Sequence, residues 1–322
     1  MPDTGPMIIG LHGLANKPPP KTLAKWWHAA IVEGLRKNRG IDDPDIPFRM
    51  VYWADRLYAY PQHRRSAYTF DNLYNREPYR EAAAGALKRY DEGFMDSVRN
   101  TLSTALGAGL DTVYKVAGLE VAGEFLLKRT GMLRDLSFYY DPERKLRGLD
   151  GEMAMARKVL MDVLRQGLED LGGRRVMIIA HSMGTIIAYD VLRDIGQDKK
   201  HGDAKWQDFT CARLATIGSP LGLALVKDKV YAERTYDAES KRLRTPTIVT
   251  EDWSNFADKR DPVSFDLMLR DDYQANARAV RVRDDLVHND YTSPAGKANP
   301  HKSYGYLRTP EMSDAIADFL GV

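Results

Sequence analysis

The fold of this chain is decided by the stretch Val176-Met177-Ile178-Ile179-Ala180-His181-Ser182-Met183-Gly184-Thr185-Ile186-Ile187-Ala188. It predicts a buried strand that turns sharply at Ser182 into an apolar helix. Small residues, Ala180 and Gly184, stand two positions before and after the serine, where a sharp turn crowds the backbone. Such a turn lifts the serine hydroxyl above a sheet edge and aims the first N–H groups of the helix at negative charge developing nearby. The alternative interpretation is a serine that only caps the helix.

Short apolar runs typical of buried parallel strands lie on both sides of this stretch. They are Met7–Leu11, Phe48–Trp53, Val176–Ala180, Ala212–Ile217, Thr247–Thr250 and Val280–Val282. Helical spacing of apolar residues appears between or after them, over residues 23–35, 153–164 and 312–320. Strands that alternate with helices predict an α/β protein with a mostly parallel sheet and helices on both faces.

Residues 56–150 interrupt the alternation, because they are helical in pattern and hold no convincing strand. The expected helices are Arg80–Thr101 and Ser103–Lys128, after a tyrosine-rich start that contains Tyr58, Tyr60, Tyr68, Tyr74 and Tyr79. Since functional insertions gather at loops of a rigid scaffold, we expect a helical cap, or lid, at 56–150 on a core of 1–55 and 151–322. The alternative is an appendage that only enlarges the core.

Composition excludes several classes of protein. The chain has 322 residues, 47 Lys+Arg against 45 Asp+Glu and a net charge of +2, so it gives no electrostatic case for nucleic-acid binding. One cysteine, Cys211, excludes an intramolecular disulfide and a multi-cysteine metal site. No dinucleotide or nucleoside-triphosphate motif and no paired-histidine motif occurs, so we expect no cofactor and no metal.

Hydropathy predicts no transmembrane segment, because no window of 18 residues is free of charge. The longest apolar-leaning stretch, Leu106–Leu127, carries four charged residues and is typical of an amphipathic helix, over the core or facing lipid as a lid. The N-terminus lacks the basic start and long apolar run of a signal peptide. We therefore expect a cytoplasmic protein.

The serine turn resembles the nucleophile elbow of the α/β-hydrolase superfamily, in particular of its lipase- and esterase-like members. The family pattern is Gly-x-Ser-x-Gly, and this chain has Ala180 first, as some lipases do. The resemblance implies an α/β-hydrolase fold with a nucleophile at Ser182, no cofactor, and a small-molecule or lipid ester as substrate.

A second feature is similar to the same family. The first strand ends in His12-Gly13-Leu14, where lipase-like hydrolases place a backbone N–H of the oxyanion hole. By that resemblance the two donors are Leu14 N–H and Met183 N–H, since two fixed donors are needed where a carbonyl oxygen becomes an alkoxide. His12 itself is expected to support the loop.

A serine hydroxyl also needs a base and an acid that orients the base. In this family the acid follows the serine and the histidine follows the acid. The stretch after Thr247–Thr250 reads as a loop that ends in Asp-Pro-Val and resembles the acid turn of lipases, so we expect Asp261, with Asp258 as the alternative. The other interpretation is a solvated charged loop.

Two histidines after the acid loop are candidates for the base. His288 has acidic neighbours, which would raise its basicity. His301 lies in a loop before the C-terminal helix, with Tyr304 three residues on, and the family places its histidine between the last strand and the last helix. We expect His301, with His288 as the alternative. His181 is expected to point away from the hydroxyl of Ser182.

These expectations combine into a serine hydrolase that cleaves a carboxylic ester through an acyl-enzyme on Ser182, with His301 as base and Asp261 as its orienting acid. An amide, peptide or thioester hydrolase would use the same residues. A catalytically silent protein that binds a ligand under its cap is the alternative from another class. Acyl-chain preference, head group and oligomeric state do not follow from the sequence.

Overall fold

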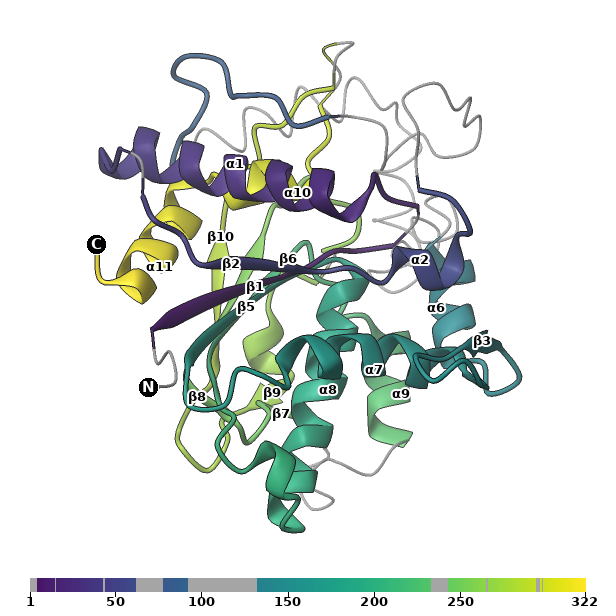
Figure 1. Ribbon diagram of the computed structural model, residues 1–322. Coiled ribbons are helices and arrows are strands. Elements are labelled where there is room, and N and C mark those ends of the chain that lie inside the picture. Colours follow the sequence, from purple (N-terminus) through teal and green to yellow (C-terminus); the bar gives the residue numbers. More distant parts are fainter. Residues whose placement is uncertain are drawn as a thin grey trace.

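The computed structural model describes residues 5–14, 16–42, 44–61, 78–91, 132–232, 243–264, 266–293, 296 and 298–322. Its centre is a six-stranded sheet with the strand order β10-β8-β6-β5-β1-β2, in which every neighbouring pair is parallel (Figure 1). The strands are β1 (Pro6–Leu11), β2 (Phe48–Val51), β5 (Arg175–His181), β6 (Cys211–Ile217), β8 (Val249–Ala257) and β10 (Val282–Leu286). The predicted mostly parallel α/β sheet is confirmed.

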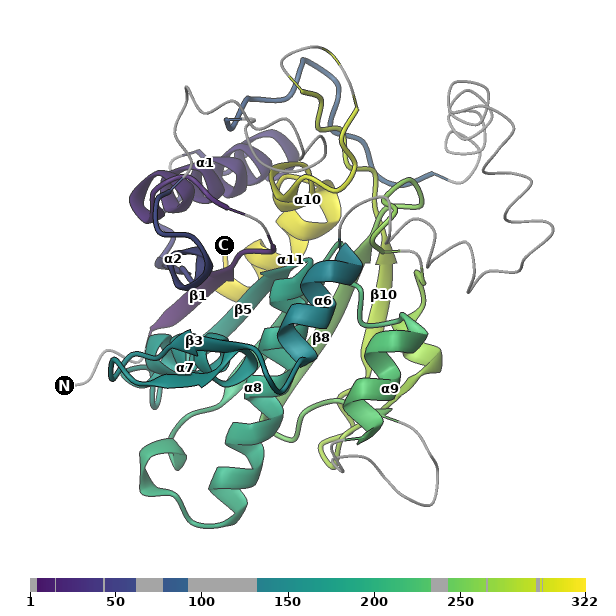
Figure 2. The ribbon, with the colours of Figure 1, turned by 90° about the vertical axis from the view of Figure 1, so that its right-hand side faces the viewer.

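Helices cover both faces of this sheet, as predicted. On one face lie α1 (Pro20–Arg39), α10 (Ser303–Leu307) and α11 (Pro310–Leu320), so the two ends of the chain pack together (Figure 1). On the other lie α7 (Ala156–Leu168) and α8 (Met183–Lys200). The helix α6 (Met132–Tyr140) stands beside α7 and α8 (Figure 2), and its Tyr139 Oη donates a 2.8 Å hydrogen bond to Asp190 of α8.

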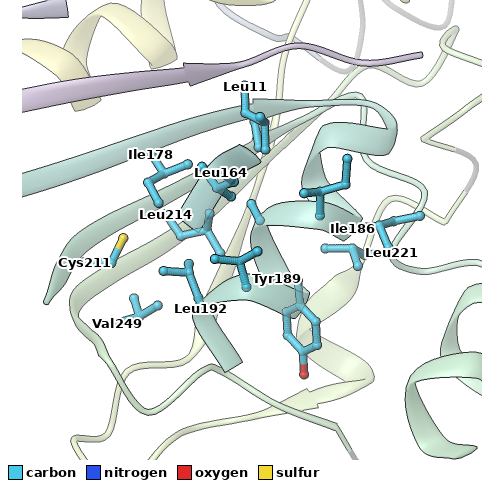
Figure 3. Packing of buried hydrophobic residues seen from close by; sticks show 14 of the residues in the cluster. Leu11, Leu164, Ile178, Ile186, Tyr189, Leu192, Cys211, Leu214, Leu221 and Val249 are labelled. Atoms are coloured by element: carbon cyan, nitrogen blue, oxygen red, sulfur yellow. The ribbon is translucent and has the colours of Figure 1, made fainter. Parts of the chain in front are cut away.

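Alternate residues of the central strands supply the two halves of the core. Ile178 of β5 belongs to the apolar cluster under α7 and α8, where it packs near Leu214 and Leu164 (Figure 3). Its neighbours Met177 and Ile179 belong to the cluster under α1 and α11. The apolar residues 176–180 of β5 are therefore buried on both sides of the sheet, as parallel strands in α/β proteins are.

The remaining described elements are small. They are α2 (Ala54–Leu57), α9 (Ala224–Ala232), β3 (Lys145–Arg147), β4 (Met153–Met155), β7 (Leu243–Arg244), β9 (Tyr273–Gln274) and the 3₁₀ turns η1 (Ala204–Trp206) and η2 (Leu269–Asp271). β3 and β4 form an antiparallel pair, and β7 pairs with β9 in parallel.

The strand predicted at Phe48–Trp53 ends already at Val51, and two later strand predictions were also wrong in their bounds. The run expected to stop at Thr250 and give way to a loop continues as β8 to Ala257, and the strand expected at 280–282 is β10, at Val282–Leu286. Polar residues made both segments look like loops, but the folded chain pairs those residues. Glu251 forms ion pairs with Arg213 of the adjacent strand β6 and with Arg175 of β5, one strand further on.

The described residues cover only part of the cap predicted at 56–150. Leu106–Leu127, Ser103–Lys128, Tyr68 and Tyr74 lie outside the described residues. Within them, the helix predicted from Arg80 is wrong as far as residue 91, because 80–91 form no helix. The hairpin β3–β4 lies where no strand was expected, and its second strand displaces the start of the next helix from 153 to Ala156.

A buried ionic group, here named the Glu33–Arg308 cluster, fastens residues 78–91 to both ends of the chain. Glu33 of α1 lies 3.0 Å from Arg308 and accepts hydrogen bonds from Tyr79 Oη and Ala82 N, both at 2.7 Å. Arg308 also binds Asp290 at 2.9 Å. Burial opposes the negative charge of Glu33, but the hydrogen bonds from Lys37 and Tyr79 and the charge of Arg308 prevail and lower its pKa.

Candidate active site

Ser182 occupies a sharp turn between β5, which ends at His181, and α8, which begins at Met183. Its backbone has φ 55° and ψ −130°, in a region that L-residues rarely adopt. The turn is possible because its neighbours are small. A Cβ on Gly184 would lie 2.7 Å from the carbonyl oxygen of His12, and one on Gly13 would lie 2.7 Å from Ser182 Cβ. Gly184 and Gly13 thus allow the loop after β1 to pack directly against the serine.

Ser182, His301 and Asp261 are joined by hydrogen bonds. His301 Nε2 lies 3.1 Å from Ser182 Oγ, and His301 Nδ1 lies 2.8 Å from Asp261 Oδ2 and 2.9 Å from Oδ1. All three residues are almost completely buried. Asp261 follows β8 and His301 lies between β10 and α10, so loops at the carboxyl edge of the sheet bring together residues that are far apart in the sequence.

Asp261 is held by two further groups. Val263 N–H donates to its Oδ1 at 2.9 Å, and Tyr306 Oη donates to its Oδ2 at 2.7 Å. The same Tyr306 oxygen accepts a 3.1 Å hydrogen bond from Asp258 N–H. Burial, together with the nearby Asp261 and Asp258, raises the pKa of Tyr306 well above its ordinary value, so the phenol stays protonated and remains a donor.

Gly218 lies against both His301 and Asp261. It follows β6 with φ +54°, and a Cβ there would lie 2.8 Å from Asp261 Oδ2 and 3.1 Å from His301 Nδ1. Only a residue without a side chain leaves this space to the pair.

The two alternative residues have other surroundings. Asp258 is engaged by Arg260, whose Nη2 lies 2.6 Å from its Oδ2, and by Asn289 N–H at 2.7 Å. His288 follows β10, and burial and Arg260 lower its pKa, although Asp258 and Asp290 act in the opposite direction. The expectation that acidic neighbours would make His288 more basic was therefore wrong. It is His301 that the structure brings to Ser182.

The predicted oxyanion donors belong to the two segments that meet at the serine. Met183 is the first residue of α8, and Leu14 follows Gly13, which packs on Ser182. The carbonyl oxygen of Leu14 accepts a hydrogen bond from Lys17 Nζ. Their role as donors to an oxyanion stays a prediction.

Two further histidines are buried at the site. His12 contacts the backbone of the loop after β1, through a 2.7 Å hydrogen bond between its Nδ1 and Gly13 O. His181 Nε2 lies 2.8 Å from the carbonyl oxygen of His301, and the two rings are 4.6 Å apart. Burial lowers the pKa of both, to about 3 for His12 and well below the ordinary value for His181. Both therefore stay neutral near pH 7.

Sequence reasoning missed Tyr306 and Gly218. It singled out Tyr304, which instead packs among the rings of Trp26, Tyr79 and Tyr291. Tyr306 stands five residues after His301 and carries no motif of its own, whereas Gly218 directly after a buried strand was a signal for a close approach.

Across the part of the chain that the structure describes, no three His, Cys, Asp or Glu residues form a group suited to a metal ion. Among the described helices, none has both the length and the apolarity to cross a membrane.

Comparison with known proteins gives one family. A family model described as "Alpha/beta hydrolase of unknown function (DUF900)" matches residues 139–213, from the end of α6 to the start of β6, and so includes Ser182 but neither Asp261 nor His301. No curated protein and no solved structure matches the chain.

Proposed function

Because this chain is a member of the α/β-hydrolase superfamily, we propose that it hydrolyses carboxylic esters through an acyl-enzyme on Ser182. The observation that carries the proposal is the continuous line of hydrogen bonds from Ser182 Oγ through His301 to Asp261, at 3.1 and 2.8 Å. Such a line supports removal of the serine proton, without which a hydroxyl is a weak nucleophile.

The first half of the reaction forms the acyl-enzyme. Ser182 Oγ attacks the ester carbonyl carbon while His301 Nε2 takes the hydroxyl proton, and Asp261 stabilises the imidazolium that results. The carbonyl oxygen becomes negative and is held by Met183 N–H and Leu14 N–H. The bond from the acyl carbon to the alcohol oxygen then breaks, and His301 gives its proton to the departing alcohol.

The second half regenerates the enzyme. A water molecule loses a proton to His301 Nε2 and attacks the acyl carbon, and the same two N–H groups hold the oxyanion. The bond to Ser182 Oγ breaks, the carboxylic acid leaves and the serine takes its proton back from His301. No cofactor enters either half.

Two features of the surroundings support this chemistry. The positive φ of Ser182 costs free energy that the surrounding packing must offset, and strain of this kind gathers at active sites. The N-terminus of α8 begins at the next residue, and the partial positive charge of a helix N-terminus favours a nearby oxyanion.

The test is covalent labelling by a fluorophosphonate, which requires an activated serine but no knowledge of the substrate. We expect labelling of the wild type and of Ser313→Ala, which loses another buried hydroxyl in α11, and none of Ser182→Ala. Hydrolysis of p-nitrophenyl esters of increasing chain length should fall by several orders of magnitude in Ser182→Ala, since members of such a triad typically contribute about 10⁴-fold or more. A loss below about tenfold would contradict the proposal.

A further inference from the structure

The side chain of His12 has a backbone partner at each ring nitrogen. Nδ1 lies 2.7 Å from Gly13 O, and Nε2 lies 3.1 Å from the backbone nitrogen of Trp53. Trp53 returns a second bond, because its indole Nε1–H donates to His12 O at 3.0 Å. The two rings are stacked, with centroids 4.6 Å apart and planes 22° apart. The imidazole is therefore held from both ends and by one face.

These partners select one tautomer. The backbone nitrogen of Trp53 can only donate, so His12 Nε2 must carry the lone pair and accept. The proton then resides on Nδ1, which donates to Gly13 O. Burial, aided by the charge of Lys17, lowers the pKa of His12 to about 3, so the ring stays in this neutral form across the working range of an enzyme.

The bond from Nδ1 fixes a peptide group of the loop. The carbonyl of Gly13 and the N–H of Leu14 belong to the same planar, trans peptide unit, so they point in opposite directions. Holding Gly13 O against His12 therefore turns Leu14 N–H away from His12. Gly13 itself lies against Ser182, where a Cβ would come within 2.7 Å of Ser182 Cβ.

We propose that His12 is a positioning residue: its Nδ1–H holds the Gly13–Leu14 peptide group so that Leu14 N–H is presented as an oxyanion donor beside Ser182. This inference rests on the proposed ester hydrolysis. Trp53, whose backbone nitrogen and indole both bind His12, lies two residues after the end of β2 at Val51. The orientation of the oxyanion loop is therefore linked to the part of the chain that leads into residues 56–150.

Kinetics of two variants test the proposal. His12→Leu removes both hydrogen bonds, and its kcat should fall by about 10- to 100-fold with KM within twofold, since misplacing a group by about 1 Å can cost about 100-fold. His12→Asn keeps an amide donor near the position of Nδ1 and should lose less. His28→Leu, in α1, is the matched control and should keep the wild-type kcat. A boronic acid, which forms a tetrahedral adduct on an active serine, should lose affinity for His12→Leu by the same factor as kcat.

The outcomes separate the two proposals. Wild-type protein that is not labelled by a fluorophosphonate contradicts the ester hydrolase. If the wild type is labelled and His12→Leu is folded and fully active, only the role of His12 is overturned. The same holds if His12→Leu lowers the melting temperature but leaves kcat and the affinity for the boronic acid unchanged. If His12→Leu does not fold, ¹⁵N NMR of the wild type decides. We expect a neutral Nδ1–H imidazole from pH 5 to 9, and an Nε2–H tautomer or an imidazolium would refute the proposal.

Discussion

Gly218→Ala tests whether the His301–Asp261 pair works in the geometry described above. The added Cβ would lie 2.8 Å from Asp261 Oδ2, 3.1 Å from His301 Nδ1 and 3.2 Å from His301 Cε1. Ordinary contact begins near 3.4 Å, so the carboxylate has to retreat by roughly 0.6 Å and the imidazole by a few tenths. Both groups are buried, and both are held by hydrogen bonds that such a movement would stretch.

The expected effect on catalysis follows from that displacement. Since a misplacement of about 1 Å can cost about 100-fold in rate, a shift of the carboxylate by more than half of that, with a smaller shift of the imidazole, should lower kcat/KM by about 10- to 100-fold. This corresponds to about 1.4–2.7 kcal/mol of transition-state stabilisation. Alanine at positive φ also costs about 1–2 kcal/mol of folding stability, wherever it is placed.

Gly40→Ala separates the two effects. Gly40 ends α1 with φ +67°, and a Cβ there would meet nothing within 4 Å. Both variants should lose the stability that alanine at positive φ costs, measured by urea unfolding with circular dichroism. Gly218→Ala should lose more, because its Cβ also displaces buried groups. Hydrolysis of p-nitrophenyl esters should fall only in Gly218→Ala. Equal kcat/KM values for the two variants would refute the assignment of His301 and Asp261 as a working pair.

Three further results are expected. His301→Ala should abolish ester turnover while His288→Ala leaves it largely intact, and the reverse pattern in kcat/KM would make His288 the base. If residues 56–150 form a cap, replacing the exposed Tyr60 by alanine should change the preferred ester chain length more than the melting temperature. An unchanged chain-length preference would favour an appendage that only enlarges the core. Stability should fall as the pH drops from about 6.5, because unfolded histidines bind protons near that pH while buried His12 and His181 do not until far lower. Each contributes a slope of up to about 1.4 kcal/mol per pH unit in urea unfolding, and His12→Leu should remove its share.

The serine turn could be read from the sequence because every feature that makes it is local. Ser182 lies between a strand and a helix that follow each other directly, and the small residues that the turn needs are two positions away. The order of serine, acid and histidine then reduced the candidates to a few residues in two loops. Asp261 and His301 are the members of those loops that the structure brings to Ser182.

What the sequence concealed depends on contacts between distant segments. β8 looked like a loop because Glu251 and Asn255 are polar, but Glu251 pairs with Arg175 and Asn255 accepts a 3.0 Å hydrogen bond from Thr216. Tyr306 reaches an aspartate 45 residues away, and no local pattern marks it. Burial by distant segments, together with Arg260, lowers the pKa of His288 where its sequence neighbours suggested a rise.

The Glu33–Arg308 cluster has a consequence for how the chain folds as it is synthesised. Glu33 and Arg308 are 275 residues apart, and both are buried in the finished protein. A nascent chain that has produced only its first half has Lys37 to pair with Glu33 but lacks Arg308, and a buried ionic group that lacks one of its partners is strongly destabilised. α1 and residues 78–91 therefore reach the full stability of their contact only after Arg308 has been synthesised. Contacts across such a long stretch form slowly, so the apolar face of α1 that packs on α10 and α11 stays exposed to solvent until those two helices have been made.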